Sequence, residues 1–199
     1  MLARRTFLPI VLGLLAALLF VASCARGPAD EARTTPQPGA PLDEISAAAT
    51  LSAITNGSQD GGQARDFTLK SIDGADIGLS DLRGSGVIIA FWATWCNYCR
   101  EELSLVADVY HELHDAGLEV LAVNVSDRPE SVLALVSELR LPYPVLMDPD
   151  GIVADLYRVR GLPTTVFVDP EGVVQRVQLG TMDEDTLRFF AGTVLPDQG

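Results

Sequence analysis

The chain has 199 residues and a formal net charge of −13 at pH 7. This length is enough for one domain with a good core plus additional segments. The excess of acidic residues argues against a nucleic-acid partner, because phosphate binding requires basic patches. We take the acidity as a contribution to solubility. The 3 cysteines include a Cys-x-x-Cys pair, Cys96 and Cys99, and one cysteine outside it.

The N-terminal segment predicts export from the cytoplasm. Arg4 and Arg5 precede an uncharged run that ends at Ser23, and Cys24 follows it. A basic start, an apolar middle and small residues before the end are typical of a secretory signal. The last four residues of this stretch, Val-Ala-Ser-Cys, resemble the bacterial lipobox, in which the cysteine is lipidated and becomes the mature N-terminus. We therefore predict a lipoprotein-type signal peptide over residues 1–23 and lipidation of Cys24.

Two alternatives remain open for this segment. The apolar run is nearly long enough to span a bilayer, so it could instead be an uncleaved transmembrane anchor. Residues 4–8, Arg-Arg-Thr-Phe-Leu, also resemble a twin-arginine export signal, although an ordinary charged start explains them equally well. Lipoprotein and anchor both place the protein on the extracytoplasmic face of a bacterial membrane.

The following segment, residues 24–62, is predicted to be a flexible tether. It is rich in Ala, Pro, Gly, Thr and Ser, and it lacks the aromatic residues that a core requires. The folded domain is predicted over residues 63–199.

The residues around the cysteine pair predict a strand followed by a helix. The apolar run from Val87 to Trp92 has no alternation, as in a parallel strand that is buried on both faces. An amphipathic run follows, with apolar residues at helical spacing from Leu103 onward. Cys96 and Cys99 therefore lie where the strand gives way to the helix.

This position predicts redox chemistry. Free N–H groups and the helix dipole stabilise an anion at a helix N-terminus, so we expect a lowered pKa for Cys96. Cys96 would then be the attacking sulfur, and Cys99, one turn further on and more buried, the resolving thiol. The expected reaction is thiol–disulfide exchange through a mixed disulfide on Cys96. Half of a zinc site is the alternative, but the chain has no second cysteine pair to complete four ligands.

The rest of the domain alternates strands and helices, which indicates an α/β sheet covered on both faces. An alternating strand and an Asp-Gly turn suggest a hairpin at the start of the domain. The predicted strands cover residues 66–70, 118–125, 145–147, 165–168 and 173–178, and the predicted helices cover 129–139, 151–158 and 183–194.

Three motifs together resemble the thioredoxin superfamily. They are Trp-Ala-Thr-Trp-Cys-x-x-Cys at 92–99, Gly-Leu-Pro-Thr-Thr at 161–165 and Asp-x-x-Gly at 169–172. The closer resemblance is to the extracytoplasmic branch of TlpA, ResA and CcmG type, and it covers roughly residues 64–195. It implies an α/β, thioredoxin-like fold with a central mixed β-sheet flanked by helices and an N-terminal hairpin extension.

The resemblance also implies roles for individual residues. Cys96 is implied to be the nucleophile and Cys99 the resolving cysteine. Pro163 is implied to be a cis-proline beside the disulfide, where the backbone of Leu162 pairs with an extended substrate. Trp95 is expected to form a wall of the site, to exclude water and to shape the contact surface.

Glu102 matches a carboxylate that ResA-type proteins carry one turn after the second cysteine. There it could tune the thiols or pass a proton to the leaving sulfur. A solvated charge on the helix surface, or a partner of the helix dipole, is an equally good explanation.

The chain also departs from the family pattern. Asn97 and Tyr98 lie between the cysteines where most of the branch has a proline, which leaves the redox potential open. Ala90 occupies the position where thioredoxin itself carries a buried Asp.

The predicted function is a membrane-tethered thiol–disulfide oxidoreductase that reduces protein disulfides, with no cofactor or metal beyond the Cys96–Cys99 disulfide. Cytochrome c maturation is one family role, and reduction of cupredoxin or oxidase copper-site cysteines is another. Electrons would come from a CcdA- or DsbD-like transmembrane donor. A disulfide-forming oxidant and a non-enzymatic copper-binding module are the alternatives. A peroxidase is disfavoured, because Thr94 lies two residues before Cys96 rather than three.

Overall fold

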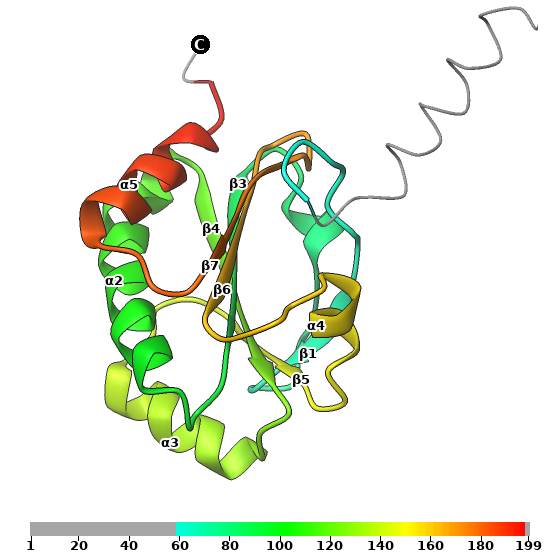
Figure 1. Ribbon diagram of the computed structural model, residues 1–199, viewed down its shortest axis with the longest axis vertical. Coiled ribbons are helices and arrows are strands. Elements are labelled where there is room, and N and C mark those ends of the chain that lie inside the picture. Colours follow the sequence, from blue (N-terminus) through cyan, green and yellow to red (C-terminus); the bar gives the residue numbers. More distant parts are fainter. Residues whose placement is uncertain (1–58, 198–199) are drawn as a thin grey trace, which may run out of the picture. The chain divides into compact units, whose positions relative to one another are not determined.

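The computed structural model describes residues 59–197, which form a sheet with helices on both faces (Figure 1). Within this part of the chain the sheet has 7 strands in the order β2-β1-β5-β4-β3-β6-β7. The helices are α2 (Asn97–Leu113), α3 (Pro129–Leu139), α4 (Ile152–Leu156) and α5 (Glu184–Thr193), with short 3-10 turns η1 (Leu79–Leu82) and η2 (His114–Ala116). The strands are β1 (Thr68–Ser71), β2 (Asp76–Gly78), β3 (Gly86–Trp92), β4 (Leu118–Val125), β5 (Val145–Asp148), β6 (Thr164–Val168) and β7 (Val174–Leu179).

Strand β3 lies at the centre of the sheet, parallel to β4 and antiparallel to β6. All of its residues are buried, which explains why its sequence shows no alternation. Ile88 and Trp92 face a core shared with α2, α3 and α5, whereas Ile89 and Phe91 face a second core that includes α4. Figure 1 shows the same division, with α2, α3 and α5 on one side of the sheet and α4 on the other. The mixed sheet flanked by helices confirms the predicted fold class.

Helix α2 follows β3 after a short connection and buries the apolar face that its sequence predicted. Leu103, Val106 and Val109 are each at most 1% exposed. The helix ends through η2 at Gly117, whose φ of 96° is the left-handed conformation that glycine adopts without a Cβ clash. The next strand, β4, starts immediately afterwards and runs parallel to β3. The carboxyl ends of β3 and β4 therefore lie together.

The predicted N-terminal hairpin is present as β1 and β2, which pair antiparallel. The structure also pairs residues just before the predicted domain start with β7. The Gly61 amide donates to the Val174 carbonyl, and the Val174 amide donates to the Gly62 carbonyl. The folded domain therefore includes the last residues of the predicted tether. The remainder of that tether and the predicted signal peptide, with Cys24, lie outside the described residues.

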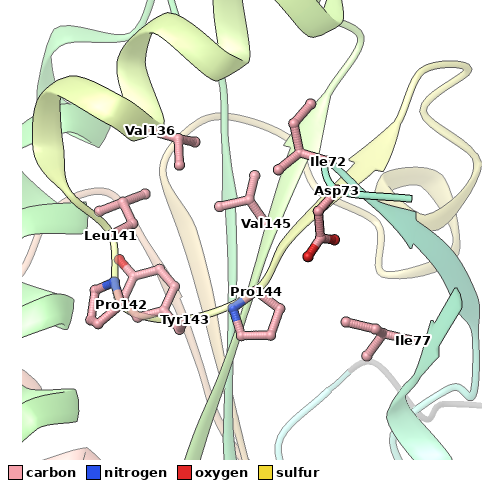
Figure 2. Close-up of a pocket in the computed structure, with 9 residues that line it drawn as sticks. All are labelled: Ile72, Asp73, Ile77, Val136, Leu141, Pro142, Tyr143, Pro144 and Val145. Atoms are coloured by element: carbon pink, nitrogen blue, oxygen red, sulfur yellow. The ribbon is translucent and has the colours of Figure 1, made fainter. Parts of the chain in front are cut away.

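A hollow on the α3 side of the sheet lies where the chain leaves α3 and enters β5. The buried Tyr143 anchors this segment, because its hydroxyl donates to the Leu103 carbonyl of α2 over 2.8 Å. Burial raises the pKa of Tyr143, so the hydroxyl stays a donor at ordinary pH. The hollow contains none of the predicted site residues. It has a volume of about 340 Å³ and is lined by Ile72, Asp73, Ile77, Val136, Leu141, Pro142, Tyr143, Pro144 and Val145 (Figure 2).

No helix within residues 59–197 is both long and apolar enough to cross a membrane.

Candidate active site

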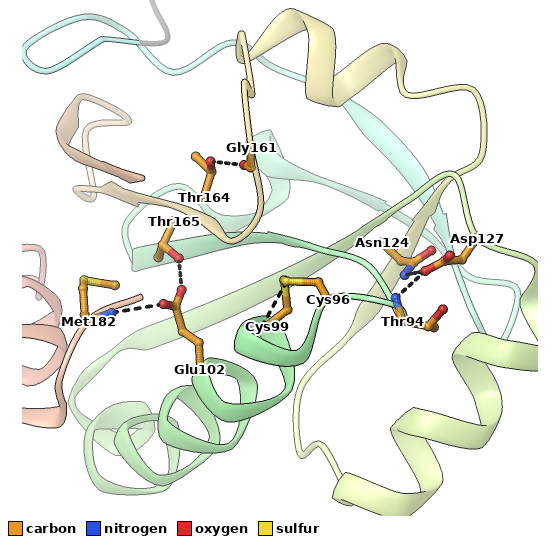
Figure 3. The surroundings of a disulfide bond; sticks show 10 residues. All are labelled: Thr94, Cys96, Cys99, Glu102, Asn124, Asp127, Gly161, Thr164, Thr165 and Met182. Atoms are coloured by element: carbon orange, nitrogen blue, oxygen red, sulfur yellow. Dashed lines mark hydrogen bonds between the residues drawn. A yellow bond between two sulfur atoms is a disulfide. The ribbon is translucent and has the colours of Figure 1, made fainter. Parts of the chain in front are cut away.

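Cys96 and Cys99 form a disulfide at the start of α2 (Figure 3). Cys96 is the N-cap residue of the helix, and Cys99 lies in its first turn, with 5.2 Å between the two Cα atoms. The backbone N–H of Cys99 donates to the Cys96 sulfur over 3.2 Å. An N–H group that already points at this sulfur, together with the helix dipole, would stabilise a thiolate there after reduction.

Both cysteines are buried, and Cys99 is the more buried of the two, as predicted. Cys96 is 6% exposed and Cys99 is 1% exposed. The side chains that flank Cys96 are open to solvent, since Trp95 is 72% and Tyr98 66% exposed. The buried disulfide therefore has two exposed aromatic residues next to it in the chain. This surface suits contact with another protein better than enclosure of a small molecule.

The Leu162–Pro163 peptide bond is cis, as the resemblance to the thioredoxin superfamily implied. It directly precedes β6, whose first residue, Thr164, pairs with Phe91 near the end of β3. Leu162 packs against the core cluster that contains both cysteines. Antiparallel pairing of β6 with β3 therefore brings the cis-proline segment and the Cys-x-x-Cys segment to the same edge of the sheet.

Leu162 and Trp95 line one cavity beside this edge, with a volume of about 390 Å³. The end of β4 and the start of α4 complete its walls, through residues that include Val125, Asp150 and Asp155. Trp95 is 72% exposed, so its side chain forms an outer wall of this cavity, in agreement with its predicted place as a wall of the site.

Glu102 is only 3% exposed, although it lies on a helix among charged residues. Its carboxylate accepts one hydrogen bond from the Thr165 hydroxyl over 2.5 Å and one from the Met182 backbone N–H over 3.3 Å (Figure 3). Burial raises the pKa of Glu102 above its usual value, and the two hydrogen bonds offset part of that rise. The alternative that Glu102 is a solvated surface charge is therefore wrong.

The Glu102 carboxylate lies on the same face of the sheet as the Ala90 side chain. Thr165, its hydrogen-bond donor, is directly opposite Ala90 in the β3–β6 ladder. Directly opposite residues of an antiparallel pair point to the same face. The buried carboxylate thus reaches the sheet next to the position where thioredoxin carries its Asp, but it comes from the helix instead.

Asp127 is a site residue that the sequence analysis missed. Its Oδ2 accepts hydrogen bonds from the Thr94 backbone N–H over 2.6 Å and from the Asn124 side-chain amide over 2.9 Å (Figure 3). Asn124 is fully buried at the end of β4. Asp127 therefore joins the loop before Cys96 to the carboxyl end of the neighbouring strand β4. The sequence signal for this role is a polar residue just after β4, because the parallel strands β3 and β4 end at the same edge of the sheet.

No group of three or more His, Cys, Asp or Glu side chains is placed to hold a metal ion within residues 59–197.

A mixed sheet, a disulfide at the N-terminus of α2 and a cis-proline before β6 define a thioredoxin-like dithiol–disulfide protein. The AhpC/TSA family model matches residues 61–177. The chain is 37% identical over 139 residues to thiol-disulfide oxidoreductase ResA of Bacillus subtilis, covering 70% of this chain and 78% of the relative. It is 41% identical over 136 residues to the thioredoxin-like protein YneN of the same organism, covering 67% and 79%.

A solved structure described as a DsbE thiol:disulfide interchange protein from Chlorobium tepidum superposes with a TM-score of 0.65 at 29% identity. The superposition covers 68% of this chain and 97% of that one. The chain belongs to the AhpC/TSA family, in the TlpA-, ResA- and CcmG-like part of the thioredoxin superfamily, and it is a thiol–disulfide oxidoreductase.

Proposed function

We propose that this protein is a membrane-tethered, extracytoplasmic reductase of protein disulfides that serves cytochrome c maturation. The observation that carries the proposal is the Cys96 sulfur at the N-cap of α2, with the Cys99 N–H pointed at it. This environment favours Cys96 as a thiolate, and the thiolate is the species that attacks a disulfide. The exposed Trp95 and Tyr98 give the site an open surface that can admit a protein substrate.

The proposed reaction starts from the reduced protein. The Cys96 thiolate attacks one sulfur of a substrate disulfide, forming a mixed disulfide and releasing the other substrate sulfur as a thiolate that takes up a proton. Cys99 then loses its proton and attacks the Cys96 sulfur, which releases the second substrate thiol and closes the Cys96–Cys99 disulfide. Two electrons pass to the substrate in each cycle.

We assign three further residues supporting roles in this reaction. Pro163 and the backbone of Leu162 hold the extended substrate beside the disulfide, which agrees with the cis bond between them and with the position of Leu162 in the adjoining cavity. Glu102 supplies or accepts a proton as the thiols change state. Its burial and raised pKa support this role, because a carboxyl with a raised pKa holds its proton nearer to neutral pH.

Return to the reduced state requires two electrons for each cycle. We propose a transmembrane donor of CcdA or DsbD type as their source, with the protein held at the membrane through lipidated Cys24 or an uncleaved N-terminal anchor. The signal-like residues 1–23 and the likeness to ResA support this location.

A trapping experiment tests the roles of the two cysteines. In Cys99→Ser the mixed disulfide on Cys96 has no resolving thiol, so substrates should accumulate as covalent adducts that a reducing agent releases. In Cys96→Ser the remaining cysteine of the pair, Cys99, is 1% exposed, so no adducts on Cys99 are expected. Adducts on Cys96→Ser and none on Cys99→Ser would overturn the assignment. Capture of immature cytochrome c by Cys99→Ser would support the proposed pathway, and its absence among abundant captured proteins would contradict it.

A further inference from the structure

The cavity between Trp95 and Leu162 has both apolar and acidic walls. Its apolar side includes Val125 at the end of β4 and the exposed indole of Trp95. Asp150 and Asp155, before and within α4, also line the cavity. An aromatic face and two carboxylates around one hollow form the combination that binds an organic cation.

Within residues 59–197, neither Asp150 nor Asp155 has a cationic partner. The ion pairs of this part of the chain join other residues, and both aspartates are exposed. Of the two arginines that follow α4, Arg158 lines a different hollow, and Arg160 is not among the residues that line this cavity. The negative charge in the cavity is therefore available to a ligand.

The position of the cavity identifies the kind of ligand. Trp95 immediately precedes the attacking Cys96, and Leu162 immediately precedes the cis-proline. A polypeptide whose cysteine meets Cys96 can place a neighbouring side chain over this hollow. The chain's net charge of −13 also favours the approach of a basic segment.

We propose that this cavity selects substrates with a lysine or arginine next to the reacting cysteine. The cationic group lies over the Trp95 ring and between the Asp150 and Asp155 carboxylates, and its aliphatic stem contacts the apolar wall. This selectivity rests on the proposed function, because it requires that Cys96 attack protein disulfides.

The test measures exchange of the reduced full chain, purified in detergent, with three peptides. Each peptide carries one cysteine as a mixed disulfide with a chromogenic thiol, and the adjacent residue is Lys, Gln or Glu. At low ionic strength the Lys peptide should react at least about tenfold faster than the Glu peptide, and salt should reduce this ratio. In Asp150→Asn/Asp155→Asn the ratio should fall by about fivefold or more.

A matched control separates this local effect from the overall charge. Asp108→Asn/Asp115→Asn makes the same change in net charge at two exposed positions outside the cavity, and it should keep the wild-type ratio. If the ratio of the Lys-peptide rate to the Glu-peptide rate falls equally in both double variants, the cavity is not the element that selects substrates. Equal wild-type rates with all three peptides would also overturn it while leaving the proposed function intact. No exchange with any peptide would refute the proposed function itself.

Discussion

The Glu102 carboxylate of α2 accepts a hydrogen bond from Thr165, which lies 63 residues further along the chain and two residues after the cis-proline. The same carboxylate accepts a second bond from the Met182 backbone, just before α5. One buried carboxylate therefore ties the helix that carries the cysteines to the strand that follows the cis-proline. Its protonation state must affect both stability and the surroundings of the disulfide.

Replacement of Glu102 by Gln should change how stability depends on pH. The pKa of Glu102 is raised in the folded protein, so the folded state holds this proton more tightly than the unfolded state. The free energy of unfolding of the wild type should therefore fall, relative to Glu102→Gln, as pH rises from the ordinary value of 4.5 through the raised folded pKa. The difference should then become constant. Urea unfolding at a series of pH values measures it.

The neighbouring Glu101→Gln is the matched control, because Glu101 is exposed on the same helical turn. The free energy of unfolding of Glu101→Gln should differ from that of the wild type by an amount that depends little on pH over that range. If Glu102→Gln and Glu101→Gln show the same pH dependence, burial does not control the proton on Glu102.

Replacement of Asp127 by Ala should destabilise the protein by about 1–3 kcal/mol. The change leaves the Thr94 N–H and the buried Asn124 amide without their acceptor. Chemical denaturation of the oxidised protein measures the loss. The exposed Asp108→Ala should stay within about 0.5 kcal/mol of the wild type. A similarly small effect for Asp127→Ala would mean that the loop before Cys96 does not depend on this carboxylate.

Two glycine-to-alanine changes should have opposite effects on stability. A Cβ atom on Gly86, at the start of β3, would lie 2.3 Å from the Val194 carbonyl oxygen, so the backbone must shift. We expect Gly86→Ala to cost about 1–3 kcal/mol. A Cβ on Gly192, in α5, meets nothing within 4 Å, so Gly192→Ala should stabilise the protein by up to about 1 kcal/mol. Thermal unfolding measures both, and equal shifts in one direction would contradict the packing of α5 against β3.

The sequence was sufficient to predict the elements that have a local signal. The unbroken apolar run of β3 and the helical spacing from Leu103 onward are visible in consecutive residues, and they place the cysteines correctly. The Asp-Gly turn at Asp73 similarly indicates the β1–β2 hairpin. The pairing of Gly61 and Gly62 with β7 could not be predicted, because a glycine-rich segment without apolar residues looks like a linker.

The parts of the site that could not be predicted depend on long-range contacts. Glu102 stands among polar residues of α2, and its burial depends on Thr165 and Met182, which the sequence does not place near it. Asp127 acquires its role only because β4 lies parallel to β3, which brings it to Thr94. Trp95 was predicted as a wall of the site, but only the structure shows how far its side chain is exposed.

The reduction potential of the Cys96–Cys99 couple tests the proposed reductase most directly. The full chain, in detergent, would be equilibrated with thiol–disulfide buffers of known reduction potential, and the fraction of free thiols would be measured. We predict a midpoint near that of thioredoxin, about −270 mV or lower. A midpoint near about −120 mV, the strongly oxidising end of the range, would contradict the account and assign the protein to disulfide formation.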